Sequence, residues 1–336
     1  MDRILLGHGS GGRLMHELIS KRFLPAFNSS ADPCVSDAAV LGLPTSGRIA
    51  ISTDSYVVSP LFFPGGDIGE MAVYGTVNDL AMVGANPLYI TAGFIIEEGL
   101  PFADLDRIVS SMARAAKRAG VSIVAGDTKV VDKGKGDGIF INTSGVGMVP
   151  DGVNLSPKNI APGDRIIISG PIGNHGVAVM SERSGLTFDP PVLSDTAPLN
   201  ALAGGMIKRF GADIKVMRDP TRGGLATTLK EFALDSGLCM SIDEDSVPVP
   251  AGVSGACDLL GLDPLYVANE GIMLAVVKPD VAEYLLEFMR LDPLGAHAGI
   301  IGRVERSPSG SVALRTKVGG SRLVDMLQGQ QLPRIC

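Results

Sequence analysis

The 336-residue chain contains no tryptophan, and aromatic residues make up only 5 % of it. Its four cysteines, Cys34, Cys239, Cys257 and Cys336, are scattered, and no two of them have Cys-x-x-Cys spacing. This pattern argues against a zinc site and against a framework of disulfides. We interpret the three internal cysteines as small buried hydrophobic residues.

The sequence also lacks a block of basic residues and a long apolar run. Its formal net charge is −7, with 29 Lys and Arg against 36 Asp and Glu, so we expect no nucleic-acid partner. The first residues, Met1-Asp2-Arg3, contain no apolar signal region, and no apolar stretch approaches the length of a membrane span. We therefore expect a cytoplasmic protein that does not enter a membrane.

Neither of the common nucleotide-binding motifs is present. The chain has no Gly-x4-Gly-Lys-Ser/Thr loop and no Gly-x-Gly-x-x-Gly turn after a predicted strand. Three other glycine-rich turns precede predicted helices, at residues 8–12, 170–176 and 221–224. Backbone N–H groups at such turns attract anions, although a glycine before a helix is commonly just a turn. We select Gly11 and Gly12 as candidate phosphate-binding residues and interpret His175 as structural.

The chain does contain enough apolar sequence for a large core. Hydrophobic residues make up 45 % of it and charged residues 19 %, and the mean hydropathy is +0.27. The 43 glycines suit an α/β enzyme with many tight turns. Because this length predicts two domains, we divide the chain into an N-terminal glycine-rich segment with a helix (1–42), a first α/β domain (43–155), a second α/β domain (156–305) and a tail module (306–336).

The pattern of hydrophobic residues predicts alternating strands and helices in both domains. A helix over 13–24 precedes them, and the segment 150–163, with prolines and glycines at its ends, marks the domain boundary. In the first domain we expect strands at 48–53, 88–96, 121–125 and 139–149, with helices at 67–83 and 102–119. In the second domain we expect strands at 165–169, 238–242, 272–277 and 299–305, with helices near 174–184, 196–209, 222–236, 252–260 and 280–290.

Five aspartates lie at predicted strand ends and turns, beside small or glycine residues: Asp37, Asp54, Asp79, Asp127 and Asp219. Carboxylates that converge at such turns suit Mg²⁺, which takes hard oxygen ligands and bridges phosphates. Any single one of them could instead cap a helix or form an Asx-turn. Because five occur in one chain, we predict that they bind Mg²⁺ and phosphate together, with Asn78 as a further candidate.

Two other residues are candidates for chemistry. Lys129 follows Gly126-Asp127-Thr128 and could neutralise phosphate charge, and the alternative is a surface lysine. Glu270 lies in Asn269-Glu270-Gly271, before an apolar strand. It could act as a general base, bind metal or cap backbone N–H groups.

The chain ends in Leu332-Pro333-Arg334-Ile335-Cys336, which places a free thiol on its last residue. Pro333 stiffens the approach to this thiol, and Arg334 places a positive charge nearby, which favours the thiolate. From Met326 onward, the extended chain would span roughly 35 Å, which is the reach of a swinging arm. The alternative is a frayed terminus whose last residue happens to be cysteine.

These motifs together resemble the HypE family of hydrogenase maturation proteins. Its superfamily includes aminoimidazole ribonucleotide synthetase, selenophosphate synthetase and thiamine-monophosphate kinase. The resemblance covers essentially the whole chain, and the terminal Pro-Arg-Ile-Cys is specific to the maturation proteins. The segments that carry it are His8-Gly-Ser-Gly-Gly12, Ser52-Thr-Asp-Ser-Tyr56, Pro60-Leu-Phe-Phe-Pro-Gly-Gly66, Gly75-Thr-Val-Asn-Asp79, Gly126-Asp-Thr-Lys-Val130, Asp219-Pro-Thr-Arg-Gly-Gly224, Asn269-Glu-Gly271 and Pro333-Arg-Ile-Cys336.

The resemblance implies an ATP-dependent carbamoyl dehydratase, a lyase that uses Mg²⁺. A partner carbamoyltransferase would load the thiol of Cys336, and a flexible C-terminal tail would carry the S-carbamoyl group to the ATP site. The carbamoyl oxygen would attack the γ-phosphate, a base would remove the nitrogen proton, and phosphate would leave to give a protein thiocyanate. An iron-carrying scaffold complex would then receive the cyanide, as a ligand for the iron of NiFe hydrogenase.

The resemblance also implies the two-domain α/β fold of aminoimidazole ribonucleotide synthetase. The N-terminal domain would bind ATP and form a homodimer through its sheet, with ATP near that interface. The resemblance implies that Lys129 contacts the γ-phosphate and that Glu270 acts as a base or as a polar anchor. It also implies that Mg²⁺ and phosphate are bound by Asp37, Asp54, Asp79, Asp127 and Asp219.

Two rival functions stay open. A related kinase or synthetase would phosphorylate a free small molecule, and its turnover would not need Cys336. A non-catalytic carrier would use the tail as a docking peptide or metal ligand and would hydrolyse no ATP. The set of Mg²⁺-type aspartates argues against the carrier, because a pure carrier needs no such cluster.

Overall fold

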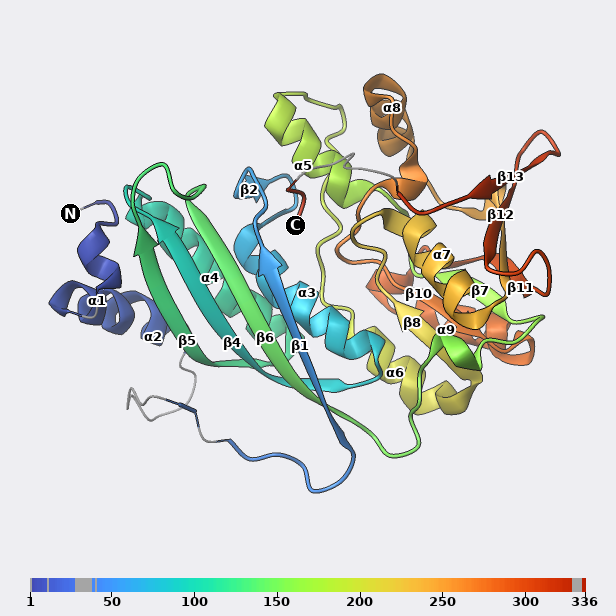
Figure 1. Cartoon of the computed structure of the whole chain (residues 1–336), viewed down its shortest axis with the longest axis horizontal. Coiled ribbons are helices and arrows are strands. Elements are labelled where there is room, and N and C mark those ends of the chain that lie inside the picture. Colours follow the sequence, from blue (N-terminus) through green and yellow to red (C-terminus); the bar gives the residue numbers. More distant parts are fainter. Residues whose placement is uncertain (1, 11, 28–37, 40, 328–333) are drawn as a thin grey trace.

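The computed structural model describes residues 2–10, 12–27, 38–39, 41–327 and 334–336, and forms two mixed α/β units (Figure 1). The C-terminus lies between the units. The helices of the described part are α1 (Arg13–Leu18), α2 (Leu24–Phe27), α3 (Ile68–Met82), α4 (Phe102–Ala119), α5 (Asn174–Ser184), α6 (Asn200–Phe210), α7 (Gly224–Ser236), α8 (Ala251–Leu260) and α9 (Ala282–Arg290). None of them is long and apolar enough to cross a membrane.

The first unit is built on a sheet with strand order β1-β6-β4-β5, and the second on a sheet with order β13-β12-β9-β11-β7-β10-β8. A two-stranded ribbon of β2 (Phe62–Phe63) and β3 (Gly66–Asp67) leads into α3. The longer strands are β1 (Arg48–Tyr56), β4 (Asn86–Glu97), β5 (Ser122–Val131), β6 (Ile139–Val149), β7 (Arg165–Ile168), β8 (Ile214–Arg218), β9 (Cys239–Asp243), β10 (Leu274–Val277), β11 (Gly299–Glu305), β12 (Ser311–Arg315) and β13 (Ser321–Val324).

The first sheet has one covered and one open face. Side chains alternate between the two faces along each strand, so Tyr56 and Ile90 are buried while Ile49 and Ile51 are exposed. Helices α3 and α4 pack on the covered face. The open face carries the apolar side chains of Ile49, Ile51 and Ile95, which are exposed to 56 %, 73 % and 46 %. In the single chain, no described segment covers these side chains.

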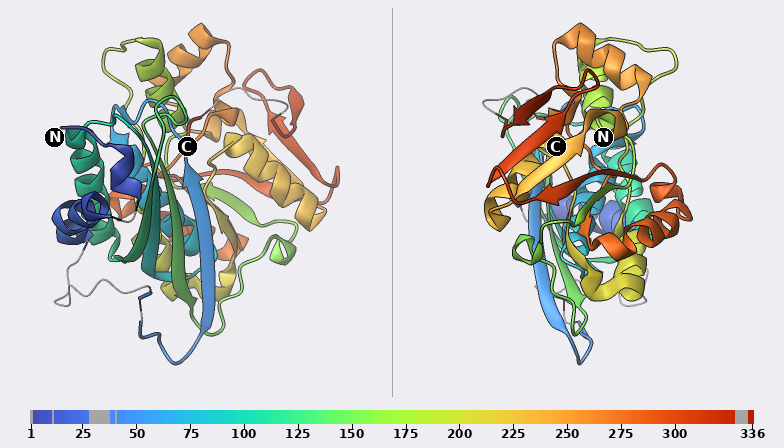
Figure 2. Two further views of the ribbon diagram at one scale, coloured as in Figure 1. Left: turned by 60° about the vertical axis from the view of Figure 1, so that its left-hand side comes forward. Right: turned by 90° about the vertical axis from the view of Figure 1, so that its right-hand side faces the viewer.

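The second sheet contains three strands that the sequence analysis did not predict. β8 was absent from the prediction, and the expected tail module over 306–336 is wrong in its first part, because β12 and β13 belong to this sheet. Figure 2, in its right-hand view, shows these two strands in red at the edge of the sheet, where β12 pairs with β9 and β13 pairs with β12. Val312 and Leu314 on β12 are buried in the core, which explains why this segment joins the domain.

Helix α3 lies at the centre of the molecule, between the first sheet and α6 and β8 of the second unit. Nearly every residue of the helix is buried, including Thr76 and Asn78. A helix that is enclosed on all sides has no solvent face to carry polar residues, which accounts for its largely apolar sequence. Polar side chains in α3 therefore need partners inside the protein.

The start of α3 depends on Asp67. Its Oδ1 accepts hydrogen bonds from the backbone N–H groups of Gly69 and Glu70, at 2.8 and 3.0 Å, and from the Ser111 hydroxyl at 2.5 Å. We expect Asp67→Ala to lower the free energy of unfolding by about 2 kcal/mol, because it removes the helix cap and leaves buried donors unpaired. Urea unfolding measures this. Asp151→Ala, on an exposed loop, is the control, and equal losses in both variants would contradict the prediction.

Candidate active site

Four carboxylates from four segments face one another where the two units meet. Asp54 lies on β1, Asp79 lies in α3, Asp219 follows β8 directly, and Glu270 lies in the turn before β10. The charges of Asp219, Asp54 and Asp79 all act on Glu270. Two neighbours compensate part of this charge: the Ser52 hydroxyl donates to Asp79 Oδ2 at 2.6 Å, and Arg222 Nη2 lies 3.9 Å from Asp54 Oδ1. We refer to these four carboxylates as the acidic cluster.

Burial and repulsion between carboxylates raise the pKa values of Asp79, Asp219 and Glu270. Burial, followed by the charge of Asp79, raises the pKa of Asp219 to about 7. Burial likewise raises the pKa of Glu270 well above its ordinary value, with Asp219 the largest charged contributor. Glu270 Oε1 is buried and has no hydrogen-bond partner. A cation or a substrate N–H group placed here would therefore be stabilised.

Sequence analysis predicted all four of these residues, and the structure changes the setting of Asp54. Asp54 lies inside a strand that runs on to Tyr56, whereas Asp79 lies inside α3, within the predicted helix over 67–83. Within the described residues, no group of three or more His, Cys, Asp or Glu side chains could hold a metal by itself. Of the five aspartates predicted to bind Mg²⁺, the structure brings Asp54, Asp79 and Asp219 close to one another.

Asp127 does not join the acidic cluster. It pairs across the sheet with Gly93, then Asn142, then Ser55, three strand spacings or about 14 Å away. Because Ser55 and Asp54 are consecutive on β1, Asp127 projects to the open face and Asp54 to the covered one. Asp37 and Gly11 lie outside the described residues.

Lys129 lies on the same strand as Asp127, β5, and pairs with it. Its Nζ lies 2.8 Å from both carboxylate oxygens, and this hydrogen bond is the main reason that the pKa of Asp127 is lowered. The glycine-rich N-terminal segment packs against the same strand: a Cβ on Gly9 would lie 2.4 Å from Val130 N. Gly12 follows as the residue before α1. Gly12, Asp127 and Lys129 thus form a second group of candidates, on β5 and the segment beside it.

Asn78, predicted as a cofactor contact, uses its side chain to join α3 to the second unit. Its side-chain amide donates to the carbonyls of Ala197 and Glu270, at 3.1 and 3.2 Å, and its Oδ1 accepts from Leu199 N–H at 2.8 Å. The side chain is fully buried. Asn78 therefore joins α3 to the second unit and fixes the backbone of Glu270, and both of its amide hydrogens are already used.

The end of the tail is docked next to the acidic cluster. Ile335 is only 3 % exposed, and Cys336 packs against the core of the first unit. Burial, followed by the charge of Glu270, raises the pKa of the Cys336 thiol to about 12. The expectation that Arg334 favours the thiolate is wrong for this docked state, because the Arg334 guanidinium pairs with Asp137. Pro333 and the rest of 328–333 lie outside the described residues.

Sequence reasoning missed the residues that support the tail and the Glu270 turn. His175 was interpreted as structural. It is fully buried, burial lowers its pKa to about 4, and its Nε2 lies 2.9 Å from the carbonyl oxygen of Ile335. Asp195 accepts hydrogen bonds from the N–H groups of Glu270 and Gly271, each at 3.3 Å. Local patterns do not mark these contacts, because Ile335 lies 160 residues from His175 and Glu270 lies 75 residues from Asp195.

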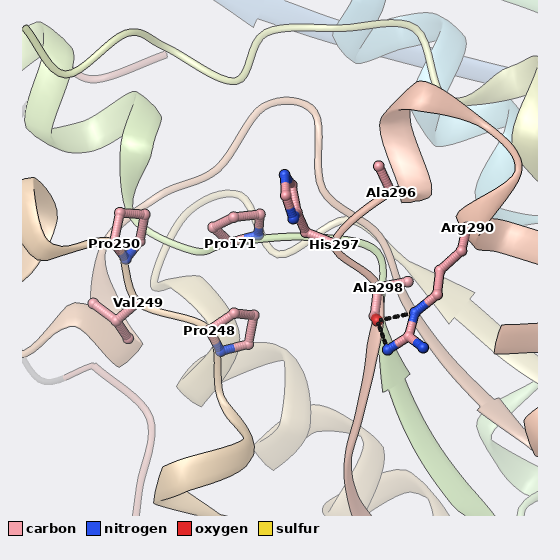
Figure 3. Close-up of a pocket in the computed structure, with 8 residues that line it drawn as sticks. All are labelled: Pro171, Pro248, Val249, Pro250, Arg290, Ala296, His297 and Ala298. Atoms are coloured by element: carbon pink, nitrogen blue, oxygen red, sulfur yellow. Dashed lines mark hydrogen bonds between the residues drawn. The ribbon is translucent and has the colours of Figure 1, made fainter. Parts of the chain in front are cut away.

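A hollow of about 530 Å³ opens elsewhere in the second unit (Figure 3). Prolines line one side of it, and Arg290 donates to the carbonyl of Ala298 on the other, at 2.9 and 3.1 Å. None of the predicted site residues lines this hollow. The acidic cluster and the docked tail therefore carry the functional argument.

The raised pKa of Asp219 predicts how stability depends on pH. A carboxyl whose pKa is higher in the folded than in the unfolded state contributes stability below the unfolded value, near 4, and loses it as pH rises through about 7. Relative to Asp219→Asn, the native protein should therefore lose up to about 4 kcal/mol between pH 4 and 7.5. Urea unfolding of both proteins in EDTA without nucleotide tests this. Curves that stay parallel across this range would contradict it.

Comparison with known proteins places this geometry in context. The AIR synthase related protein family matches over two domains, the N-terminal at residues 35–149 and the C-terminal at 161–315. A carbamoyl dehydratase HypE from Rhizobium leguminosarum bv. viciae is 52 % identical over 334 residues, 99 % of this chain and 95 % of the relative.

Solved structures agree along the whole length of the chain. A crystal structure of hydrogenase maturation protein HypE in complex with ATP matches with a TM-score of 0.94 and 49 % identity, and covers 99 % of each chain. A chain in a crystal structure of a HypE–HypF complex matches with a TM-score of 0.81 and 52 % identity, over 94 % of this chain and 100 % of that one.

Proposed function

Because this chain belongs to the HypE family of carbamoyl dehydratases, we propose that it dehydrates an S-carbamoyl group on its own Cys336 in an ATP-dependent reaction. The product is a thiocyanate, which supplies cyanide for the iron of NiFe hydrogenase. One observation carries the proposal: the docked thiol of Cys336 lies close enough to Glu270 for that carboxylate to raise its pKa. The reacting group and a buried base thus meet at one place.

The chemistry requires two bond changes, one at the γ-phosphorus of ATP and one at the carbamoyl carbon. First, the carbamoyl oxygen attacks the γ-phosphorus, an O–P bond forms, and the bond to ADP breaks. The nitrogen releases one of its two protons to solvent as the C=N bond forms. Next, a base removes the remaining N–H proton, the C–O bond breaks, and phosphate leaves with the oxygen, so that C≡N remains on sulfur. We assign the base to Glu270, because its Oε1 is buried and unpartnered and can accept the proton.

The high pKa of the docked thiol supports a separate loading step. A thiol with a pKa of about 12 is a poor nucleophile at neutral pH. Carbamoylation of Cys336 is therefore assigned to an undocked tail, held by a partner carbamoyltransferase. The solved HypE–HypF complex of a relative supports a protein partner for this step. An iron-carrying scaffold complex is the acceptor that we assign to the cyanide.

The acidic cluster fits a divalent cation held jointly with ATP. Mg²⁺ typically takes one or two carboxylates and completes its coordination with phosphate oxygens and water. Asp54, Asp79 and Asp219 are the residues that would hold it. Burial raises the pKa values of Asp79 and Asp219, and neighbouring carboxylates raise them further, so a positive ion would be stabilised here. When bound, the ion would neutralise phosphate charge. The solved ATP complex of a relative supports the nucleotide.

A homodimer would complete the site. In one chain, Asp127 and Lys129 lie on β5, at the far edge of the sheet from Asp54 on β1, and Gly9 of the glycine-rich segment packs against β5. The open face bears exposed isoleucines that a second copy would cover. A two-fold arrangement of these faces can set β5 of one copy beside β1 of its partner. We therefore propose that phosphate contacts from Lys129 and the glycine-rich segment come from the partner copy.

Mass spectrometry of the intact protein tests the function. The protein is incubated with the carbamoyltransferase and carbamoyl phosphate, before and after addition of MgATP. We expect a carbamoyl-sized gain on the C-terminal peptide, and then loss of one water only with ATP. If ATP is consumed on an added small molecule while the tail stays unmodified, the protein is instead a related kinase or synthetase. If neither change occurs, the carrier function replaces the dehydratase.

A further inference from the structure

The last three residues contact the protein as a bound peptide would. They lie alongside residues 57–59, which follow β1, and run in the opposite direction. The N–H of Val57 donates to the carbonyl of Cys336, and the N–H of Ser59 donates to the carbonyl of Arg334, both at 3.3 Å. Recognition of an extended peptide by pairing with an exposed strand is a common binding mode.

The second unit supplies two more donors, both from α5. His175 Nε2 lies 2.9 Å from the carbonyl oxygen of Ile335, and Arg183 Nη2 donates to the carbonyl of Arg334 at 2.7 Å. Because a carbonyl can only accept, Nε2 carries the hydrogen, and Nδ1 accepts from the Ser194 hydroxyl at 2.9 Å. Each main-chain carbonyl of the last three residues is thus bonded to a donor outside the tail.

Side chains add selectivity to these main-chain contacts. Ile335 is buried in the core cluster that includes Val179 and Ala268, so the second-last position accepts an apolar side chain. Arg334 pairs with Asp137 and donates from Nε to the carbonyl of Val57 at 3.2 Å. The third-last position is therefore suited to a basic side chain that remains partly exposed.

We propose that this junction is a peptide-recognition site that accepts a C-terminal Arg-Ile-Cys supplied as a separate peptide. The contacts join the tail to residues at least 151 positions away in sequence, and none of them needs the intervening chain. The covalent link then only raises the local concentration, typically to the millimolar range. That a bound peptide is also dehydrated rests on the proposed function, whereas binding itself does not.

The binding experiment uses the protein truncated after Pro333 and a labelled peptide, Gln-Gln-Leu-Pro-Arg-Ile-Cys. Fluorescence anisotropy, followed up to millimolar protein, should show saturable binding without ATP. A peptide with aspartate in place of isoleucine should bind at least about tenfold more weakly, because a charge would enter the buried pocket. Equal binding of both peptides, or no saturation by the truncated protein when circular dichroism shows it folded, would overturn the site.

Matched variants test the donor from His175. In the truncated protein, His175→Leu removes the donor and should weaken peptide binding about tenfold. His175→Gln keeps an N–H near the Nε2 position and should stay within about threefold of the unsubstituted protein. His297→Gln, on the exposed rim of the hollow, is the control. Equal weakening by the Leu and Gln variants would overturn the assignment of this hydrogen bond to recognition.

Measurement of turnover distinguishes failure of this proposal from failure of the proposed function. Truncated protein with MgATP should convert an S-carbamoylated peptide to the thiocyanate, as intact protein converts its own tail. If the peptide binds and is not converted while the intact tail is, the claim of a separate substrate fails and the dehydratase stands. If the intact tail also fails to react, the proposed function fails, while peptide binding is judged by anisotropy alone.

Discussion

Replacing Cys336 with alanine will reduce both carbamoyl loading and ATP-dependent loss of water to background. The sulfur carries the reacting carbon through both bond changes, and no other described cysteine lies at the junction. Among the other described cysteines, Cys239 and Cys257 are buried in the second unit. Intact mass after incubation with the carbamoyltransferase and MgATP measures the effect.

Cys257→Ala is the matched control for this variant. It removes a buried thiol that lies in another hydrophobic cluster, so modification of the tail should continue at the native level. Binding of ATP by Cys336→Ala should be unchanged, which would show that the nucleotide site survives. Loss of water from Cys336→Ala after loading would mean that another thiol carries the substrate.

Glu270→Gln will lower the rate of water loss from a loaded tail by about 10²- to 10⁴-fold, the usual contribution of a general base. Glutamine preserves the size of the side chain and removes its ability to accept the proton. A single-turnover assay, quenched and read by mass, isolates this step from loading. Glu182→Gln, exposed on α5, is the control and should react at the native rate.

The pH profile adds a second measurement for Glu270. Its raised pKa means that the ionised base is depleted at low pH and accumulates as pH rises. The native rate should therefore increase with pH to values well above the ordinary range of a glutamate, and the residual rate of Glu270→Gln should lack this limb. An unchanged profile in the variant would place the base elsewhere.

Local sequence patterns predicted the elements whose structure is fixed locally. The predicted helix over 102–119 matches α4, because its amphipathic pattern is strong and Gly120 ends it with φ of 71°. β8 and β12, with five residues each, were not predicted, although β9 is equally short and was predicted, so length alone does not explain the difference. Their place in the sheet also depends on partners far along the chain.

The residues of the site also fall into those that local sequence identifies and those whose position depends on distant partners. Asp54, Asp79, Asp219 and Glu270 could be selected by residue type and neighbours, and the structure brings them together. The separation of Asp127 from them could not be predicted, because the face that a strand residue occupies depends on the register and packing of the sheet. The same holds for Asn78, whose hydrogen-bond partners lie more than 100 residues away.

The buried amide of Asn78 has a consequence for where the molecule can move. By joining α3 to the backbone at Ala197, Leu199 and Glu270, it ties the two units together beside the acidic cluster. The docked chain end is held through hydrogen bonds to its main-chain carbonyls and through the pairing of Arg334 with Asp137. We therefore expect the tail to leave the junction without separation of the two units.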